Sequence, residues 1–114
     1  MLDINLEFSR GMLFVRLNGI LDKSTCSKLS DCLDNMINEK ELKYFVLNLE
    51  NLTSIDERGL QSIIDRYFDA VLHDGKLVIC GYNNQFTENL EVKSIFEQIE
   101  HTNNELGAFR LINI

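Results

Sequence analysis

The stretch YFVLNLENLTSIDERGLQSIIDRY, residues 44–67, decides the fold. It opens with a short and mostly apolar run from Tyr44 to Leu49, rich in residues that favour strands. Such a run is typical of a strand in the middle of a sheet, buried on both faces. A loop from Glu50 to Ile55 is expected next, followed by an amphipathic helix. The stretch therefore predicts a strand–loop–helix unit of an α/β domain.

The junction of this unit, Asp56-Glu57-Arg58-Gly59, suggests a site. Asp56 is placed to cap the helix, because an N-cap carboxylate accepts hydrogen bonds from the free N–H groups there. Glu57 suits the positive end of the helix dipole, whereas Arg58 does not and needs another contact, either with Asp22 or with a partner. Gly59 in a first turn costs roughly 1 kcal/mol relative to Ala. A close approach of another backbone would explain that cost.

Upstream, the pattern predicts a β-hairpin and a first helix. Alternating apolar residues predict a half-buried strand, and a second strand is expected from Met12 to Leu17 after a turn at Arg10-Gly11. A loop from Gly19 to Thr25 then leads into an amphipathic helix from about Thr25 to Lys40, and Ser24 and Thr25 are good N-cap residues for it. The alternating positions of the first strand are Ile4, Leu6 and Phe8.

Downstream, two helices and one or two strands are expected. Gly75 is a plausible residue to end the helix that Asp56 begins, and Leu77–Cys80 predicts another buried strand. Residues 86–90 suggest a short helix and residues 92–99 a further one, although Gln98–His101 could form a short edge strand. A terminal helix is expected from Asn103 to Ile112. The apolar stripe of the helix after Asp56 comprises Leu60, Ile63, Ile64, Tyr67, Phe68 and Val71, and the terminal helix has Leu106, Phe109 and Arg110 on or near one face.

The order β-β-α-β-α-β-α-(β)-α predicts one α/β domain spanning residues 1–114. Alternation of strands and helices implies parallel pairing with right-handed crossovers. We therefore expect a mostly parallel mixed sheet of four to five strands with about four helices packed on it.

Composition narrows the range of partners. A formal net charge of −7 argues against nucleic acid and against anionic membranes, which both reward Lys and Arg clusters. The cysteines Cys26, Cys32 and Cys80 are too few and too irregularly spaced for a disulfide framework or a metal site, and they are interpreted as small buried residues. Without a signal peptide or a long apolar run, the chain is expected in the cytoplasm and not inserted in a membrane.

Catalytic chemistry has little support in the sequence. His73 and His101 lack the neighbouring Cys, Ser or carboxylate pattern of a nucleophile or metal site, so both are interpreted as surface or structural residues. The six glycines are isolated and form no phosphate-binding loop. We expect neither metal nor cofactor, and a small hydrolase or nucleotide binder is the least favoured hypothesis.

Two loops are better candidates for a site, Gly19–Thr25 and Thr53–Leu60. Each follows the carboxyl end of a strand and enters a helix, and ligands of parallel α/β sheets usually bind at that edge. The second loop also delivers a helix N-terminus, whose free N–H groups favour an anion, including a phosphate on Ser or Thr.

These residues resemble the STAS domain family, in particular its anti-sigma factor antagonists. Leu17–Thr25 is similar to the strand-to-helix segment of the family, with its Gly-x-Leu/Ile-Asp core, and Val46–Asp56 to its central strand and loop. Gly59-Leu60 and Ile63–Tyr67 resemble the helix that follows, and Gly75–Gly81 the next strand. The likeness covers nearly the whole chain and is specific from Leu17 to Gly81.

The resemblance implies a binding switch and not an enzyme. The unphosphorylated members bind an anti-sigma factor that is also a serine kinase of the GHKL type, which frees a bacterial sigma factor. The kinase phosphorylates a Ser or Thr after the Asp of the motif, and the modified protein is released until a phosphatase resets it. The resemblance also suggests a monomer or weak dimer. By this likeness, partner contacts would come from Asp22, Ser24, Thr25, Asp56, Glu57, Arg58, Gly59 and Leu60.

The motif of this chain departs from the family at its centre. Where the family reads Asp-Ser-Ser/Thr-Gly-Leu, this chain reads Asp56-Glu57-Arg58-Gly59-Leu60, so neither acceptor position carries a hydroxyl. The chain could bind an anti-sigma factor without the switch, with Glu57 imitating part of a phosphate and Arg58 cancelling part of that charge. Regulation could have moved to Thr53, Ser54, Ser24 or Thr25. Alternatively, the domain could be an accessory or scaffold subunit of a transporter or signalling assembly.

Overall fold

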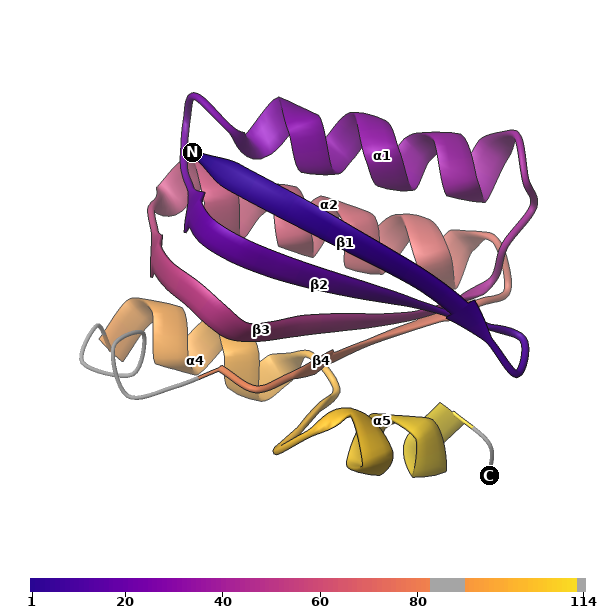
Figure 1. Cartoon of the computed structure of the whole chain (residues 1–114). Coiled ribbons are helices and arrows are strands. Elements are labelled where there is room, and N and C mark those ends of the chain that lie inside the picture. The colour runs from indigo at the N-terminus through magenta and orange to yellow at the C-terminus, as the bar shows by residue number, and fades with distance from the viewer. Residues whose placement is uncertain (83–89, 113–114) are drawn as a thin grey trace.

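The computed structural model describes residues 1–82 and 90–112 (Figure 1). The elements are β1 (Leu2–Ser9), β2 (Met12–Leu21), α1 (Cys26–Asn38), β3 (Tyr44–Ile55), α2 (Glu57–Leu72), β4 (Lys76–Cys80), α4 (Leu90–Gln98), β5 (His101–Thr102) and α5 (Glu105–Ile112). The predicted order of elements is confirmed, including the terminal helix. A short edge strand is present, but it lies at His101–Thr102 and shares only His101 with the predicted Gln98–His101, because Gln98 belongs to α4. The short helix expected over residues 86–90 lies almost wholly outside the described residues.

A five-stranded mixed sheet forms the centre of the domain, in the order β1-β2-β3-β4-β5. Strand β1 pairs antiparallel with β2, and the remaining neighbours are parallel. The predicted mostly parallel α/β sheet is therefore confirmed. Four helices pack on it within the described residues.

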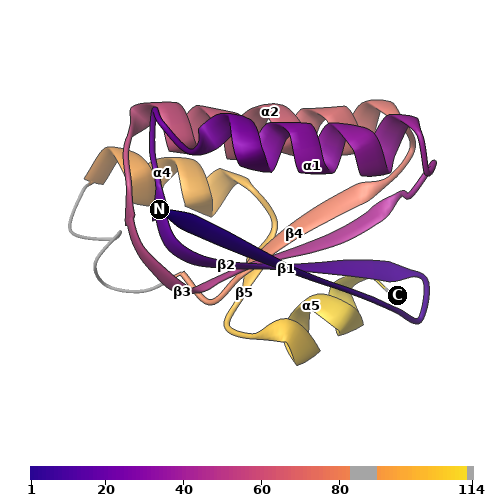
Figure 2. The same cartoon turned by 45° about the horizontal axis from the view of Figure 1, so that its top comes forward.

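The helices lie on both faces of the sheet. Helices α1, α2 and α4 cover one face and α5 the other (Figure 2). Side chains of β2, β3 and β4 alternate between these faces, as the period of a strand requires. The larger core lies under α1, α2 and α4, and its buried strand residues include Leu13, Val15, Leu17, Phe45, Leu47, Leu49, Leu77 and Ile79. The smaller core under α5 comprises Met12, Phe14, Val46, Val78, Cys80 and Ala108.

Helix α5 is tied to the sheet by an ion pair. Arg16 donates from Nε to Glu105 Oε2 at 2.7 Å and from Nη2 to Glu105 Oε1 at 2.9 Å, and Asn48 Nδ2 donates to the same carboxylate at 2.9 Å. The Arg16 hydrogen bond lowers the pKa of Glu105. This anchor turns Ala108 and Phe109 to the sheet, since positions three and four apart share a helix face. Of the three residues predicted on or near one face of this helix, Phe109 packs against the smaller core, whereas Leu106 is 58% exposed and Arg110 is also exposed.

Strand β3 is longer than predicted, because the expected loop from Glu50 to Ile55 belongs to it. Strand β2 also continues to Leu21 and pairs Ile20 with Ser54 and Leu21 with Ile55. Two register shifts interrupt this pairing, and backbone hydrogen bonds hold the extension although most of its side chains are exposed. The pattern of apolar side chains in the sequence therefore could not reveal that β2 and β3 extend this far.

Several residues predicted to be buried are exposed. Leu6 and Phe8 of β1 are 38% and 59% exposed, and Phe68 and Val71 of α2 are 57% and 49% exposed. Strand β1 lies at the sheet edge, so the larger core reaches only its first half, where Leu2 is buried. Phe68 and Val71 lie on a flank of α2 that the core does not reach.

The end of α2 also differs from the prediction. Asp74, with φ of 59°, takes the left-handed position expected of Gly75. Gly75 comes next and donates its N–H to the Ala70 carbonyl at 2.8 Å, while Asp74 donates to Val71 at 3.1 Å. This pair of bonds is a Schellman motif.

Candidate partner-binding site

The two predicted loops lie side by side at the carboxyl ends of β2 and β3, because these strands are paired up to Leu21 and Ile55. Asp56 joins them. Its Oδ1 accepts the N–H of Gly59 at 2.8 Å, its Oδ2 accepts the N–H of Lys23 at 3.0 Å, and its own N–H donates to the Leu21 carbonyl at 3.3 Å. The predicted N-cap is confirmed, and the same carboxylate also holds the neighbouring loop.

Gly59 is required by the close approach of another backbone. A Cβ at this position would overlap the carbonyl group of Leu21. The approach explains why a glycine stands in the first turn of α2 and confirms the close contact predicted from its cost. It also lets the start of α2 press against the end of β2, with Leu60 buried beneath.

Asp22 organises the first loop through local hydrogen bonds. Its Oδ1 accepts the N–H and hydroxyl of Ser24 at 2.9 and 2.8 Å and the N–H of Thr25 at 3.1 Å. These bonds, above all that from the Ser24 hydroxyl, lower the pKa of Asp22. Asp22 is thus engaged within its own loop.

Thr25 does not cap α1 with its side chain, contrary to the prediction. It is the N-cap residue, but no side-chain capping bond forms. Its hydroxyl donates instead to the Ile20 carbonyl at 2.8 Å and accepts the N–H of Asp22 at 2.9 Å. The hydroxyl therefore closes the loop back onto the end of β2.

Glu57 and Arg58 are exposed on the first turn of α2. Within the described part of the chain, neither forms a side-chain hydrogen bond or an ion pair. The suggested contact of Arg58 with Asp22 is therefore wrong. Arg58 is thus a cation at the positive end of a helix that forms no ion pair within the described structure.

The two hydroxyls upstream of Asp56 differ. Thr53 is exposed, and its Oγ1 donates to the Gly19 carbonyl at 2.9 Å. Ser54 is also exposed, and its hydroxyl has no hydrogen-bond partner among residues 1–82 and 90–112. Of the four hydroxyls that sequence reasoning named near this edge, that of Ser54 is the most available.

Sequence reasoning missed Lys23, whose backbone N–H is the second donor to Asp56. Every non-proline residue carries this group, so no side-chain signal could have revealed the contact. It depends on the alignment of β2 beside β3.

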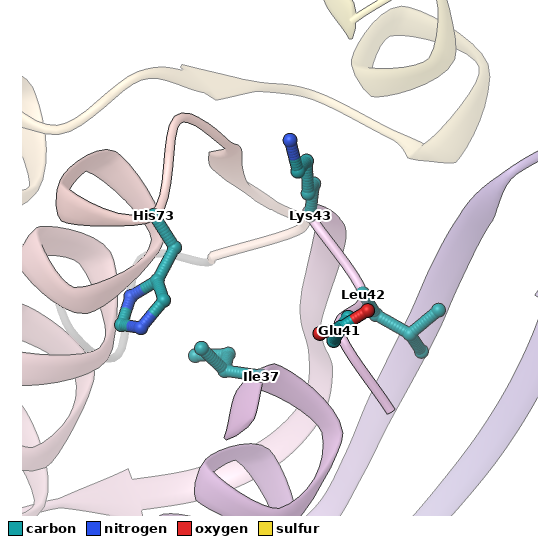
Figure 3. A pocket seen from close by; sticks show the side chains of 5 residues that line it. All are labelled: Ile37, Glu41, Leu42, Lys43 and His73. Atoms are coloured by element: carbon teal, nitrogen blue, oxygen red, sulfur yellow. The ribbon is translucent and has the colours of Figure 1, made fainter. Parts of the chain in front are cut away.

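A cavity of about 340 Å³ lies at the opposite end of the sheet, where α1 and α2 end. In Figure 3 the His73 ring and Ile37 lie across from one another, while Lys43 points away. His73 Nδ1 is already within 2.8 Å of the Asp69 carbonyl oxygen. The lining groups do not converge on a common point, so this cavity offers no arrangement for catalysis.

Metal-binding clusters and membrane-spanning helices are absent from the described residues. The described residues contain no group of three or more His, Cys, Asp or Glu side chains that could hold a metal ion. None of the described helices is both long enough and apolar enough to span a membrane. Burial raises the pKa of the Cys80 thiol to about 12, so this thiol is a poor nucleophile.

The sequence matches the STAS domain family over residues 3–108. The chain therefore belongs to the STAS domain family. It is 30% identical over 113 residues to the anti-sigma F factor antagonist of Paenibacillus polymyxa, a match that covers 99% of this chain and 97% of that protein.

Solved structures of anti-sigma factor antagonists share this fold. The one from Mycobacterium paratuberculosis matches with a TM-score of 0.86 at 12% identity, over 100% of this chain and 96% of that chain. The Bacillus protein SpoIIAA in its unphosphorylated form matches with a TM-score of 0.78 at 17% identity, over 98% of this chain and 100% of that chain. At these identities the likeness shows the fold.

Proposed function

We propose that this chain is an anti-sigma factor antagonist that docks on an anti-sigma factor of the GHKL serine kinase type and so releases a sigma factor. Its similarity to the Paenibacillus antagonist over nearly the full length of both proteins supports this function. Its role is binding and not catalysis, and it acts in the cytoplasm as a monomer or weak dimer.

Arg58 is the residue that most strongly supports this location of the docking surface. Its guanidinium is exposed, lacks a partner in the described structure and lies where the dipole of α2 disfavours a cation. A carboxylate on the partner would remove that penalty, and Arg is enriched among residues that dominate binding energy. The docking surface proposed here consists of Arg58 with Asp22, Ser24, Thr25, Asp56, Glu57, Gly59 and Leu60.

The buried members of this surface support it from below. Gly59 and Leu60 bring α2 against β2, and Asp56 holds the adjoining loop at Lys23. The exposed members then present a shape that forms before the partner arrives. Such preorganisation reduces the entropy lost on binding.

We also propose that docking is not switched off by phosphorylation at the turn. Glu57 and Arg58 occupy the two acceptor positions and have no hydroxyl. If a kinase modifies this edge of the sheet, the expected acceptor is the exposed hydroxyl of Ser54, which has no hydrogen-bond partner within the described part of the chain.

Calorimetry against the kinase-type anti-sigma factors of the same genome tests the function. We expect one of them to bind, and Arg58→Ala to weaken that affinity about tenfold or more, which corresponds to about 1.4 kcal/mol. Arg110→Ala is the matched control, because Arg110 is an exposed arginine on α5, at the other face of the sheet. Binding by none of these factors would refute the function. Equal effects of the two variants would refute only the surface.

A double variant, Glu57→Ser with Arg58→Ser, tests the missing switch. Incubated with the bound kinase and ATP, it should gain a phosphate that the wild-type protein does not acquire at this turn, as mass spectrometry would show. A variant that binds without becoming phosphorylated would mean that the turn differs in shape from that of switched family members. Phosphate mapped to Ser54 in the wild type would show that regulation has moved.

A further inference from the structure

The outer edge of β1 is unpaired in the described structure. Strand β1 has β2 on one side and lies at the end of the sheet order. Met1 stands opposite Ile20, and the Ile20 N–H donates to the Met1 carbonyl at 2.9 Å. Antiparallel strands alternate between pairs that exchange hydrogen bonds and pairs that do not. Met1 is hydrogen-bonded to β2, so every second residue that follows it, beginning with the next one, turns its backbone N–H and carbonyl groups away from β2. These outward residues are Leu2, Ile4, Leu6 and Phe8.

A contact at Leu2 agrees with this direction. Lys28 Nζ of α1 donates to the Leu2 carbonyl at 2.6 Å, which closes the start of the edge. No other described residue hydrogen-bonds to the outward backbone groups from Ile4 to Phe8. Within the described structure, about half of β1 thus offers backbone donors and acceptors in the geometry of a strand.

The two faces of this free segment differ in chemistry. On the α1 face, Leu6 and Phe8 leave an apolar strip at the edge, as their exposure shows. On the α5 face, Asp3 and Glu7 are both exposed. Two cations lie on the same face: Arg16 binds Glu7 at 2.8 Å and Glu105 at 2.7 Å, and Arg10 lines the same hollow, with its guanidinium 5.5 Å from the Phe109 ring centre. Among the described residues here, the carboxylates of Asp3, Glu7 and Glu105 still outnumber these two cations. The edge therefore separates an apolar side from an acidic side.

This division disfavours a second copy of the chain as the occupant. If two β1 strands paired antiparallel about Asn5, Asp3 of one copy would stand opposite Glu7 of the other. Like charges directly opposite each other destabilise a strand pair. The net charge of −7 adds a general repulsion between copies.

We propose that the edge from Ile4 to Phe8 receives an extended segment of another protein in which apolar residues alternate with Lys or Arg. Backbone hydrogen bonds would add a sixth strand to the sheet, the mode of recognition known as β-augmentation. The apolar side chains of the segment would cover Leu6 and Phe8, while its basic side chains would face Asp3 and Glu7. This interaction is separate from the docking turn and does not depend on the function proposed above.

A short peptide of alternating lysine and valine is a suitable probe, with a control peptide of the same composition whose lysines and valines are grouped. At a concentration ten times its Kd, the alternating peptide should slow hydrogen exchange at the amides of Ile4, Leu6 and Phe8 about tenfold. No slowing at these amides, or equal slowing by the grouped peptide, would overturn the proposal. Protection that rises with protein concentration and needs no peptide would assign the edge to a second copy instead.

Two variants separate the edge from general charge attraction. Leu6→Pro removes an outward N–H without touching the bonds to β2, and edge strands tolerate proline at such positions. It should abolish the protection while the remaining spectrum stays folded. Leu6→Ser keeps every backbone group and the net charge but removes the apolar contact with the valines of the peptide, so it should also weaken binding and serves if the proline variant unfolds. Unchanged binding by the folded variant would overturn the proposal.

Discussion

Two turns at the same edge of the sheet use an aspartate in opposite ways. After β2, Asp22 accepts its hydrogen bonds from Ser24 and Thr25, the residues that follow it directly. After β3, Asp56 caps its own helix and reaches across to Lys23 in the other turn. The first carboxylate shapes one loop, whereas the second joins two loops.

The difference distinguishes a turn whose polar side chains stabilise their own loop from a turn whose side chains are available to contact a partner. The Ser24 and Thr25 hydroxyls already donate their hydrogen within the first turn, so donating to a partner would require breaking those bonds. In the second turn, the exposed Glu57 and Arg58 are unengaged within the described residues. The second turn is therefore where a partner would gain most, and the following changes test that contrast in order of their expected effect.

Gly59→Ala should have the largest effect on stability. Its Cβ would overlap the Leu21 carbonyl group, and overpacking of this kind costs about 3 kcal/mol. Gly11→Ala is the control, because Gly11 has φ of 83° but open space around a Cβ, so strain alone of about 1–2 kcal/mol is expected. Urea denaturation measures both free energies of unfolding. Equal losses would mean that the backbones are not held together at Gly59.

Asp56→Ala should come next. It removes the cap of α2 and the bond to Lys23, and loss of an N-cap costs about 1–2 kcal/mol. Asp56→Asn retains one carbonyl acceptor and should cost less in the same denaturation experiment. If the two substitutions are equivalent, the carboxylate does not hold both turns.

Asp22 should titrate below the usual range of an aspartate, because Ser24 and Thr25 stabilise its charged form. A depressed folded pKa contributes stability that is present above the pKa of the unfolded chain and is lost as pH falls through the folded pKa. The Asp22→Asn variant should therefore lose less stability than the wild type as the solution is acidified below pH ~4. NMR titration of the Asp22 carboxyl carbon checks the sign, and a pKa at or above the unfolded value would contradict it.

Glu57→Gln and Arg58→Gln should have the smallest effects on folding. Both side chains are exposed without partners in the described structure, so each change should stay within about 0.5 kcal/mol. Thermal unfolding followed by circular dichroism measures this. A larger loss from either variant would mean that the residue supports the turn, as Asp22 does, and would remove the contrast between the two turns.

Much of the site could be predicted because its signals are local. An aspartate just before an apolar helical stripe predicts an N-cap, and Asp56 is one. A glycine in the first turn of a helix, where it costs stability, predicts the close approach of another backbone, and Gly59 has such an approach from Leu21. The contact between Asp56 and Lys23 could not be predicted, since it uses a backbone N–H brought near by strand pairing. The lack of an Arg58–Asp22 ion pair follows equally from contacts that the sequence does not show.

By itself, the sequence determined the order of strands and helices, the parallel α/β class, the capped helix and the absence of a hydroxyl at Glu57 and Arg58. These properties follow from residue identity and periodicity within one segment. Only the tertiary structure decided how far β3 extends, which face α5 presents and which half of β1 stays uncovered. The physical reason is that each of these depends on a neighbouring element. Burial of a side chain and pairing of a backbone both require a second element of the fold, so the sequence of one segment does not determine them.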